Sequence, residues 1–204
     1  MVAVMCVAAA VSLGNAQTPS GQTGGKPSGT QSADKPADKG QTAAKGKTAK
    51  ADQGFVREAA MSGMAEVELG RLAADKASNA DVKKFGQRMV DDHGKANDEL
   101  KGIASGKTLD LPTSLGPKHM AIRDKLAKLS GDAFDRAYMA EMVRDHDQAV
   151  QLFQRASKSG SDAEIKAFAE KHLPHLREHQ KMARDLSSKV RGSAKAAEKK
   201  PGAQ

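Results

Sequence analysis

The string "MVDDH" at residues 89–93 returns as "MVRDH" at residues 142–146. Both copies lie in long stretches where apolar residues recur every three or four positions, the spacing typical of an amphipathic α-helix. On a helix with 3.6 residues per turn, the histidine of each copy, His93 or His146, falls at the centre of the apolar stripe. The repeat therefore predicts two helices of a bundle, each turning a histidine towards the core.

Four long helical patterns, with a shorter one between the second and the third, cover residues 53–190. The long patterns run over about 53–77, 80–105, 132–157 and 162–188, and the shorter one over about 117–129. We expect helix-start signals at Asp52, at Asn79, at Pro117 and in the capping-box pair Ser161 and Glu164. Short loops flank one long crossover, so the sequence predicts an all-α, ferritin-like four-helix bundle with a short crossover helix between helices 2 and 3.

Residues 1–16 read as a signal peptide that is cleaved after Ala16. The segment is an apolar run too short to span a membrane, and it ends in the small residues Gly14, Asn15 and Ala16. In one respect the segment departs from the usual pattern, because no Lys or Arg precedes the apolar run. From the apolar run and the small residues at its end, we expect export to the periplasm or the outer membrane. Cleavage would remove Cys6, the single cysteine, and exclude disulfides and thiolate metal sites.

The basic charge of the chain is concentrated near its ends. Of the net charge of +8, residues 17–52 contribute six Lys against three Asp, whereas residues 55–190 hold 23 basic and 21 acidic residues. Residues 17–52 and 191–204 contain almost no large apolar side chains, so we predict a disordered linker and a disordered basic tail. A nearly neutral domain argues against specific nucleic-acid binding, and the tails could contact an envelope surface. The oligomeric state is not specified.

Several ionisable side chains fall on the apolar stripes of the predicted helices, where they are costly unless paired or ligated. They are Glu66, His93, His146, His172, His175 and His179. Counting from the short loops places four of them at a similar depth, about 13 to 15 residues away: Glu66, His93, His146 and His175. We expect these four to converge near mid-bundle, with His172 or His179 as a further neighbour.

A set of one carboxylate and several imidazoles suits zinc, copper or a single iron. It suits a carboxylate-bridged di-iron site less well, because Val90 and Val143 stand where the Glu-x-x-His motif has its glutamate. Met89 and Met142 precede the two histidines by one turn and could add thioether ligands for Cu(I). A buried hydrogen-bonded network without a metal is the competing interpretation.

Neighbouring residues are expected to have lesser roles. Asp92 and Asp145 lie at the flank of their stripes, where they would orient neighbours or be solvated. His119, in the crossover helix, is expected at the surface. The stretch "HLREH" (175–179) matches the H-x-x-E-H pattern of inverted zinc peptidases, but only Glu198 follows it as a carboxylate ligand.

Four stretches together resemble an exported bacterial family, domain of unknown function 4142, whose members are often labelled outer-membrane proteins. The stretches are "GMAEVELGRLA" (63–73), "FGQRMVDDHGKANDEL" (85–100), "LSGDAFDRAYMAEMVRDHDQAV" (129–150) and "IKAFAEKHLPHLREHQKMARDL" (165–186). The resemblance covers essentially all of residues 53–190. It implies a ferritin-like helical bundle in the envelope, and it implies no activity.

Two function classes remain open. In the first, an exported bundle protein binds or buffers a transition metal at a His-rich centre, in envelope stress defence. In the second, a non-catalytic envelope scaffold has a buried histidine network and makes its contacts through the basic tails. The chain contains no phosphate-binding glycine loop and no nucleophile elbow, so we predict no catalytic residues and favour a binding protein over an enzyme.

Overall fold

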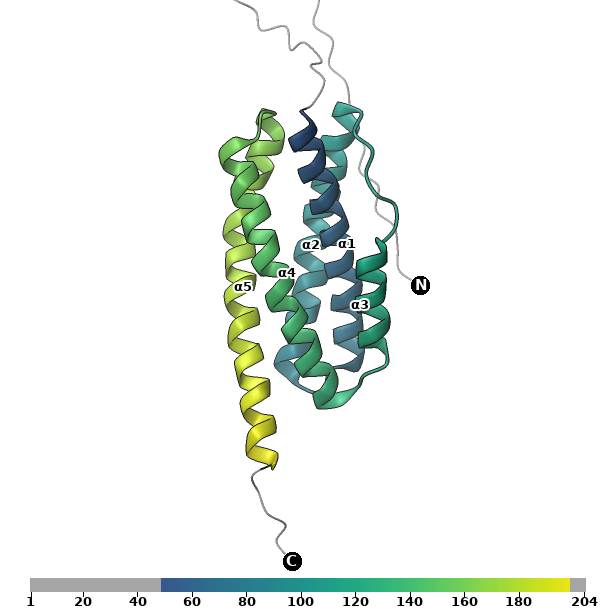
Figure 1. Cartoon of the computed structure of the whole chain (residues 1–204), viewed down its shortest axis with the longest axis vertical. Helices are drawn as coiled ribbons and strands as arrows, with labels where there is room; N and C mark the ends of the chain where they lie inside the picture. Colours follow the sequence, from purple (N-terminus) through teal and green to yellow (C-terminus); the bar gives the residue numbers. More distant parts are fainter. Residues whose placement is uncertain (1–48, 199–204) are drawn as a thin grey trace, which may run out of the picture. The chain divides into compact units, whose positions relative to one another are not determined.

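The computed structural model describes residues 49–198, which form five α-helices and no strand (Figure 1). The helices are α1 (Lys50–Lys76), α2 (Ala80–Lys107), α3 (Pro117–Ala127), α4 (Gly131–Ser159) and α5 (Ala163–Glu198). None of these five helices is long and apolar enough to cross a membrane. The expected signal peptide, and the expected linker up to residue 48, lie outside the described residues.

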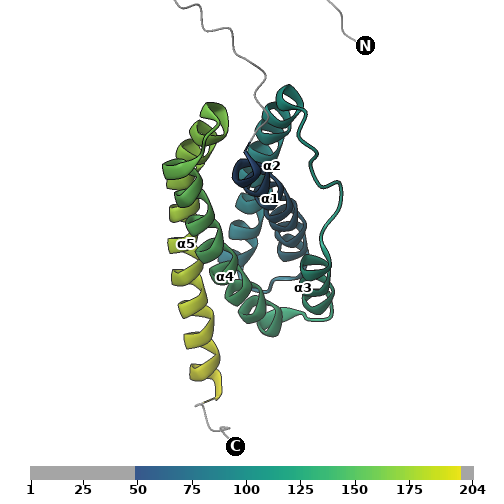
Figure 2. The same cartoon turned by 45° about the horizontal axis from the view of Figure 1, so that its top comes forward.

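Two helical hairpins joined by a crossover make up the bundle. The chain runs along α1 and back along α2, and the connection with α3 then returns it to the opposite end, from which α4 and α5 form the second hairpin (Figures 1 and 2). The crossover helix α3 packs outside the bundle against α1 and α4. The predicted fold class is confirmed: an all-α bundle of four long helices, with a short crossover helix between the second and third.

The predicted helix starts agree with the structure at α2 and α3 and fail at α1 and α5. Asn79 caps α2, because its side chain accepts hydrogen bonds from the amides of the first turn, and Pro117 opens α3. Asp52 is not a cap: α1 begins at Lys50, and Asp52 lies inside its first turn. Ser161 is not the cap of α5 either, since Asp162 Oδ1 accepts from the amides of Glu164 and Ile165.

The predicted disordered segments need correction at both borders. Residues 50–52, assigned to the linker, belong to α1, and residues 191–198, assigned to the tail, continue α5. Both pieces are rich in Ala and Lys, which favour helix even where no apolar surface is buried. A helix that is already nucleated by packing extends through such residues at little cost.

Two buried aspartates tie each hairpin to the loop of the other. Asp52, near the start of α1, accepts hydrogen bonds from the amides of Ser161 and Asp162 in the α4–α5 loop. Asp135, near the start of α4, accepts bonds from Asn79 and from the amide and hydroxyl of Ser78 in the α1–α2 loop. Loop amides that would otherwise be unsatisfied thus obtain charged acceptors. We call this arrangement the reciprocal aspartate caps.

Glycines allow α1 and α2 to approach closely. A methyl group placed on Gly86 would lie 2.7 Å from Ala73 Cβ and 2.8 Å from Gly70 O. Both distances are shorter than a van der Waals contact, so the two backbones come together here only because a side chain is missing. The glycines in "GMAEVELGRLA" and "FGQRMV" therefore serve helix packing.

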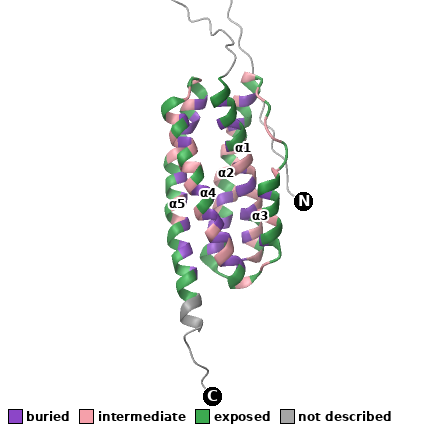
Figure 3. Ribbon diagram, viewed as in Figure 1, coloured by how far each residue is buried: buried purple, intermediate pink, exposed green. Residues whose placement is uncertain are grey.

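The apolar core is divided into two clusters. The first surrounds the α1–α2 loop and includes Leu69, Phe85, Phe134, Met142 and Leu186. The second lies towards the α4–α5 loop and includes Phe55, Leu100, Phe153, Ile165 and Leu176. Each long helix has an ionisable residue of its inward stripe between the two clusters: Glu66, His93, His146 and His179. Buried positions form stripes along the long helices (Figure 3), and at mid-height these four residues make a polar layer between the apolar clusters.

Candidate metal centre

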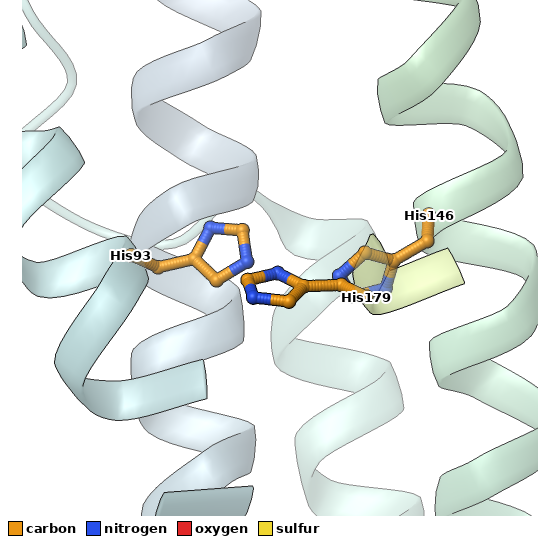
Figure 4. Close-up of side chains that lie close together, drawn as sticks. All are labelled: His93, His146 and His179. Atoms are coloured by element: carbon orange, nitrogen blue, oxygen red, sulfur yellow. The ribbon is translucent and has the colours of Figure 1, made fainter. Parts of the chain in front are cut away.

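Three histidines from three helices meet in the polar layer. His93 comes from α2, His146 from α4 and His179 from α5, and their rings turn towards one another (Figure 4). One ring nitrogen of each lies within 4.8 Å of those of the other two. The ring centroids are 5.5 to 5.7 Å apart. We call this group the three-histidine centre.

Hydrogen bonds fix the tautomers of two of these rings. His146 Nδ1 lies 2.9 Å from the carbonyl oxygen of Met142, and since a carbonyl only accepts, Nδ1 carries the proton and Nε2 keeps a lone pair. His179 Nε2 lies 2.9 Å from Asp92 Oδ2, so Nε2 donates and Nδ1 keeps the lone pair. Carboxylate and carbonyl partners orient metal-binding imidazoles in this way.

One ring nitrogen of each of the three histidines is buried without a hydrogen-bond partner. These nitrogens are His93 Nε2, His146 Nε2 and His179 Nδ1. Buried polar atoms are nearly always hydrogen-bonded, so each exception needs an explanation. Three such nitrogens on converging rings are explained together if they are ligands for one cation.

Burial keeps the three rings neutral at neutral pH. It lowers the pKa of His146 to about 4, and it holds the pKa of His93 well below the ordinary value, with help from the neighbouring histidines. Burial also lowers the pKa of His179, although the hydrogen bond to Asp92 works in the opposite direction. Metal binding requires an unprotonated imidazole, so the centre does not have to release ring protons to accept a cation.

Glu66 lies behind His146 and outside the group of ligand nitrogens. Its Oε1 is 3.7 Å from His146 Nδ1, the nitrogen that is already bonded to Met142. Burial, and then the charges of Asp145 and Glu141, raise the pKa of Glu66 well above its ordinary value. The structure thus places Glu66 beside His146 and does not bring it together with the three histidines around one point, as the sequence had led us to expect.

His175 does not converge with His93 and His146, and His179 takes its place. His175 is exposed, and His172 Nε2 is bonded to Glu99 Oε2 at 2.9 Å. Counting residues from the loop ignored the direction of the side chains, which lean towards the N-terminus of their own helix. In an antiparallel pair the two leanings are opposite, so His146 meets a residue about one turn farther along α5.

Two other expectations also fail, and one residue had a role that the sequence did not reveal. His119 is buried in α3 rather than exposed, and Asp145 is buried rather than solvated. Burial and Glu141 raise the pKa of Asp145 to about 6.

Met142 orients His146 through its backbone carbonyl, a contact that no side-chain pattern indicates. Asp92 lies at the edge of the site and orients His179, as its flanking position suggested.

A cavity of about 340 Å³ reaches the three-histidine centre between α1, α2, α4 and α5. His93 and His179 line it, as do His172, His175 and Asp92. Most of the remaining wall is apolar, with Leu100, Leu152, Phe153, Phe168 and Leu176. The centre is therefore buried and yet adjoins a cavity.

Solved structures with the same fold include one protein, CopM, in copper-bound forms. A DUF305 fragment from Deinococcus radiodurans is 12% identical with a TM-score of 0.62, and the alignment covers 70% of this chain and 98% of that one. CopM in the Cu(I)-bound form is 17% identical with a TM-score of 0.57, covering 68% and 96%. A DUF305 protein from Streptomyces coelicolor, provisionally described as secreted, is 18% identical with a TM-score of 0.59, covering 69% and 92%. At these identities the similarity shows the fold alone.

Sequence comparison adds the family. No curated protein matches the chain. The profile of the domain of unknown function DUF4142 matches residues 37–186, which include the three-histidine centre and confirm the resemblance seen in the sequence. The chain therefore belongs to the DUF4142 family.

Proposed function

We propose that this protein binds one copper ion, as Cu(I), at His93, His146 and His179. The observation that carries the proposal is a set of three converging imidazoles, each of which has one buried ring nitrogen without a hydrogen-bond partner. Two of these rings are held in the tautomer that a ligand needs. No protein group among the described residues satisfies these nitrogens, and a buried polar atom without a partner is costly.

The charge of the centre favours a monovalent ion. Three neutral imidazoles contribute no negative charge, and the cost of burying a cation rises with the square of its charge. Imidazole binds zinc, iron and copper, but among these ions only copper is available as a monovalent cation. The structural similarity to CopM in Cu(I)-bound and Cu(II)-bound forms supports the choice of copper.

We assign the protein a binding or buffering role in the bacterial envelope, active in stress defence. The apolar segment at residues 1–16 supports export, as does the description of the Streptomyces coelicolor relative. A copper ion held among neutral, buried imidazoles is sequestered from bulk water and from competing thiol or amine ligands in solution. Sequestration of this kind suits a buffer better than an enzyme.

Competition with a chromophoric Cu(I) chelator tests the proposal. The purified protein is expected to take up one Cu(I) per chain, and X-ray absorption should show nitrogen neighbours at about 2.0 Å. His146→Ala should lower the affinity by at least about 100-fold. His119→Ala removes a buried imidazole from α3 and should leave the affinity unchanged, so it is the matched control. Wild-type protein that binds no copper under these conditions contradicts the proposal.

A further inference from the structure

The orientation of His179 by Asp92 has a counterpart two turns away on the same pair of helices. Glu99 stands seven residues after Asp92 on α2, and His172 stands seven residues before His179 on the antiparallel α5. The bond from His172 Nε2 to Glu99 Oε2 is 2.9 Å, the same length as the bond between His179 and Asp92. Lys171 Nζ also donates to Glu99 Oε2, at 2.8 Å, and holds the carboxylate in place.

The Glu99 contact fixes the tautomer of His172. A carboxylate accepts, so Nε2 carries the proton and Nδ1 keeps a lone pair, as in His179. His175 follows one turn later on the same face of α5, and the ring centroids of His172 and His175 are 6.4 Å apart. Residues three apart on a helix are neighbours, so a rotation of the exposed His175 side chain can bring two nitrogens to one ion.

The three histidines on this face of α5 differ in exposure. His175 is exposed, the side chain of His172 is 16% exposed, and that of His179 is 2% exposed. All three line the cavity that leads to His93. Along α5, His175 lies about 6 Å from His179 and His172 about 10 Å from it, by helical rise. The cavity therefore has the pair His172 and His175 in its more exposed part and His179 at its buried end, with His175 one helical turn from His179.

An ion that crosses this cavity needs such intermediate ligands. The aliphatic and aromatic wall cannot replace the water or chelator ligands that the ion must lose, so an unassisted passage carries a large desolvation cost. Imidazoles spaced by one helical turn allow the ion to exchange one ligand at a time without becoming bare.

We infer that His172 and His175, with Glu99 orienting His172, form a loading site that captures the cation and passes it to the three-histidine centre. This inference rests on the proposed function. It adds a second, weaker metal site at the cavity mouth and a direction of transfer along α5. Each transfer exchanges one neutral nitrogen ligand for another, without a change in the oxidation state of the ion.

The rate of loading separates this role from that of the buried ligands. Cu(I) is supplied as its complex with a chromophoric chelator, and transfer is followed by stopped-flow absorbance. The double variant His172→Ala/His175→Ala should load about ten-fold more slowly than wild type while still reaching one ion per chain. His119→Ala should load at the wild-type rate. Glu99→Gln, which keeps both imidazoles but loses the charged acceptor, should have an intermediate rate.

A second measurement detects the loading site directly. In His93→Ala/His146→Ala, which lacks the buried centre, a weak Cu(I) site should remain, and it should disappear when His172 and His175 are also replaced. If His172→Ala/His175→Ala loads at the wild-type rate, or if the weak site is absent from His93→Ala/His146→Ala, the inference is overturned. The proposed metal binding at the three-histidine centre is unaffected by either result. Failure of wild-type protein to bind Cu(I) removes the proposed function and the loading site together.

Discussion

Asp92 joins two structural roles at one carboxylate. Its Oδ2 accepts from His179 Nε2 at 2.9 Å and from Arg88 Nε at 3.2 Å. These contacts lower the pKa of Asp92, against the effect of its partial burial, so the group stays charged and keeps His179 in the tautomer with a free Nδ1. The strength of metal binding should therefore depend on a residue that does not touch the metal.

Asp92→Asn tests this dependence. The amide can accept only through its oxygen and carries no charge, so it holds the His179 ring less firmly. Loss of a carboxylate partner of this kind typically reduces metal affinity by about 10-fold to 100-fold, and we expect this for Cu(I) in the chelator competition. Asp98→Asn is the control, because Asp98 is an exposed partner of Lys101 on the same helix. An unchanged affinity in Asp92→Asn would show that packing alone orients His179.

Asp145 should make the stability of the domain depend on pH. Its folded pKa of about 6 lies above the ordinary value of 3.8, because of burial and the nearby Glu141. Between about pH 4 and pH 6 the folded state holds a proton that the unfolded state has released. The contribution of Asp145 to the unfolding free energy is therefore present below this window and lost as the pH rises through it.

Asp145→Asn removes this titration. We expect the variant to gain stability relative to wild type as the pH rises from 4 to 7, by up to about 3 kcal/mol. Urea unfolding of both proteins at several pH values measures the difference. Asp91→Asn, at an exposed aspartate of α2, should show no such trend. A constant difference between wild type and Asp145→Asn across this range would contradict the assignment.

For individual residues, the sequence predicted that His93 and His146 turn inwards, but it did not predict the hydrogen-bond partners of the histidines. Periodicity within one helix is sufficient to place His93 and His146 on a buried stripe. The contact between Asp92 and His179 joins residues 87 positions apart, and its geometry depends on the relative height of two helices. The carbonyl of Met142 carries no side-chain signal at all, so only the structure reveals its role.

The contact between α1 and α2 illustrates how an element depends on a missing side chain. Gly86→Ala would place a methyl group 2.7 Å from Ala73 Cβ. Overpacking of this kind costs about 1 to 3 kcal/mol, whereas the higher helix propensity of alanine returns at most about 1 kcal/mol. We expect a net loss of about 1 to 2 kcal/mol in urea unfolding.

Gly102→Ala on the same helix provides the matched control. No atom lies within 4 Å of a methyl group at this position, so only the propensity gain remains, and the variant should be more stable than wild type by about 0.5 to 1 kcal/mol. Equal effects at the two positions would mean that the helices separate freely and that close approach is not required.

Helix identities followed from the sequence more reliably than helix heights. The apolar periodicity and short loops predicted every long helix to within a few residues, except for the C-terminal end of α5. The depth of a side chain also depends on where its helix begins and on the direction in which the side chain leans. For this reason His146 lies beside His179 and not beside the expected His175, which comes four residues earlier on α5.

For the molecule as a whole, stability should reside in residues 49–193. The apolar clusters extend from Phe55 to Val190, and nothing beyond them adds buried apolar surface within the described part of the chain. A version trimmed to these residues should unfold with the same midpoint as the full chain, within a few degrees, in a thermal scan followed by circular dichroism. Loss of a cooperative transition after trimming would count against the prediction.

The overall architecture was predictable because it depends on patterns that are local in sequence. Helical periodicity, two short loops and one long connection are together compatible with one order and direction of the four long helices. The division of the core into two clusters could not be predicted in the same way, since it emerges only when the ionisable residues of four helices are aligned at one height. The cavity beside the three-histidine centre likewise depends on how side chains of all four helices fill space.

The reciprocal aspartate caps affect the order in which the chain can fold. The loop of the α1–α2 hairpin is completed by Asp135 of the second hairpin, and the loop of the α4–α5 hairpin by Asp52 of the first. In an isolated hairpin, water would have to replace that aspartate at the turn amides, so each turn gains its charged acceptor only when the two hairpins dock. A protease cut in the crossover should therefore leave two fragments whose turns are stabilised again when the fragments reassociate.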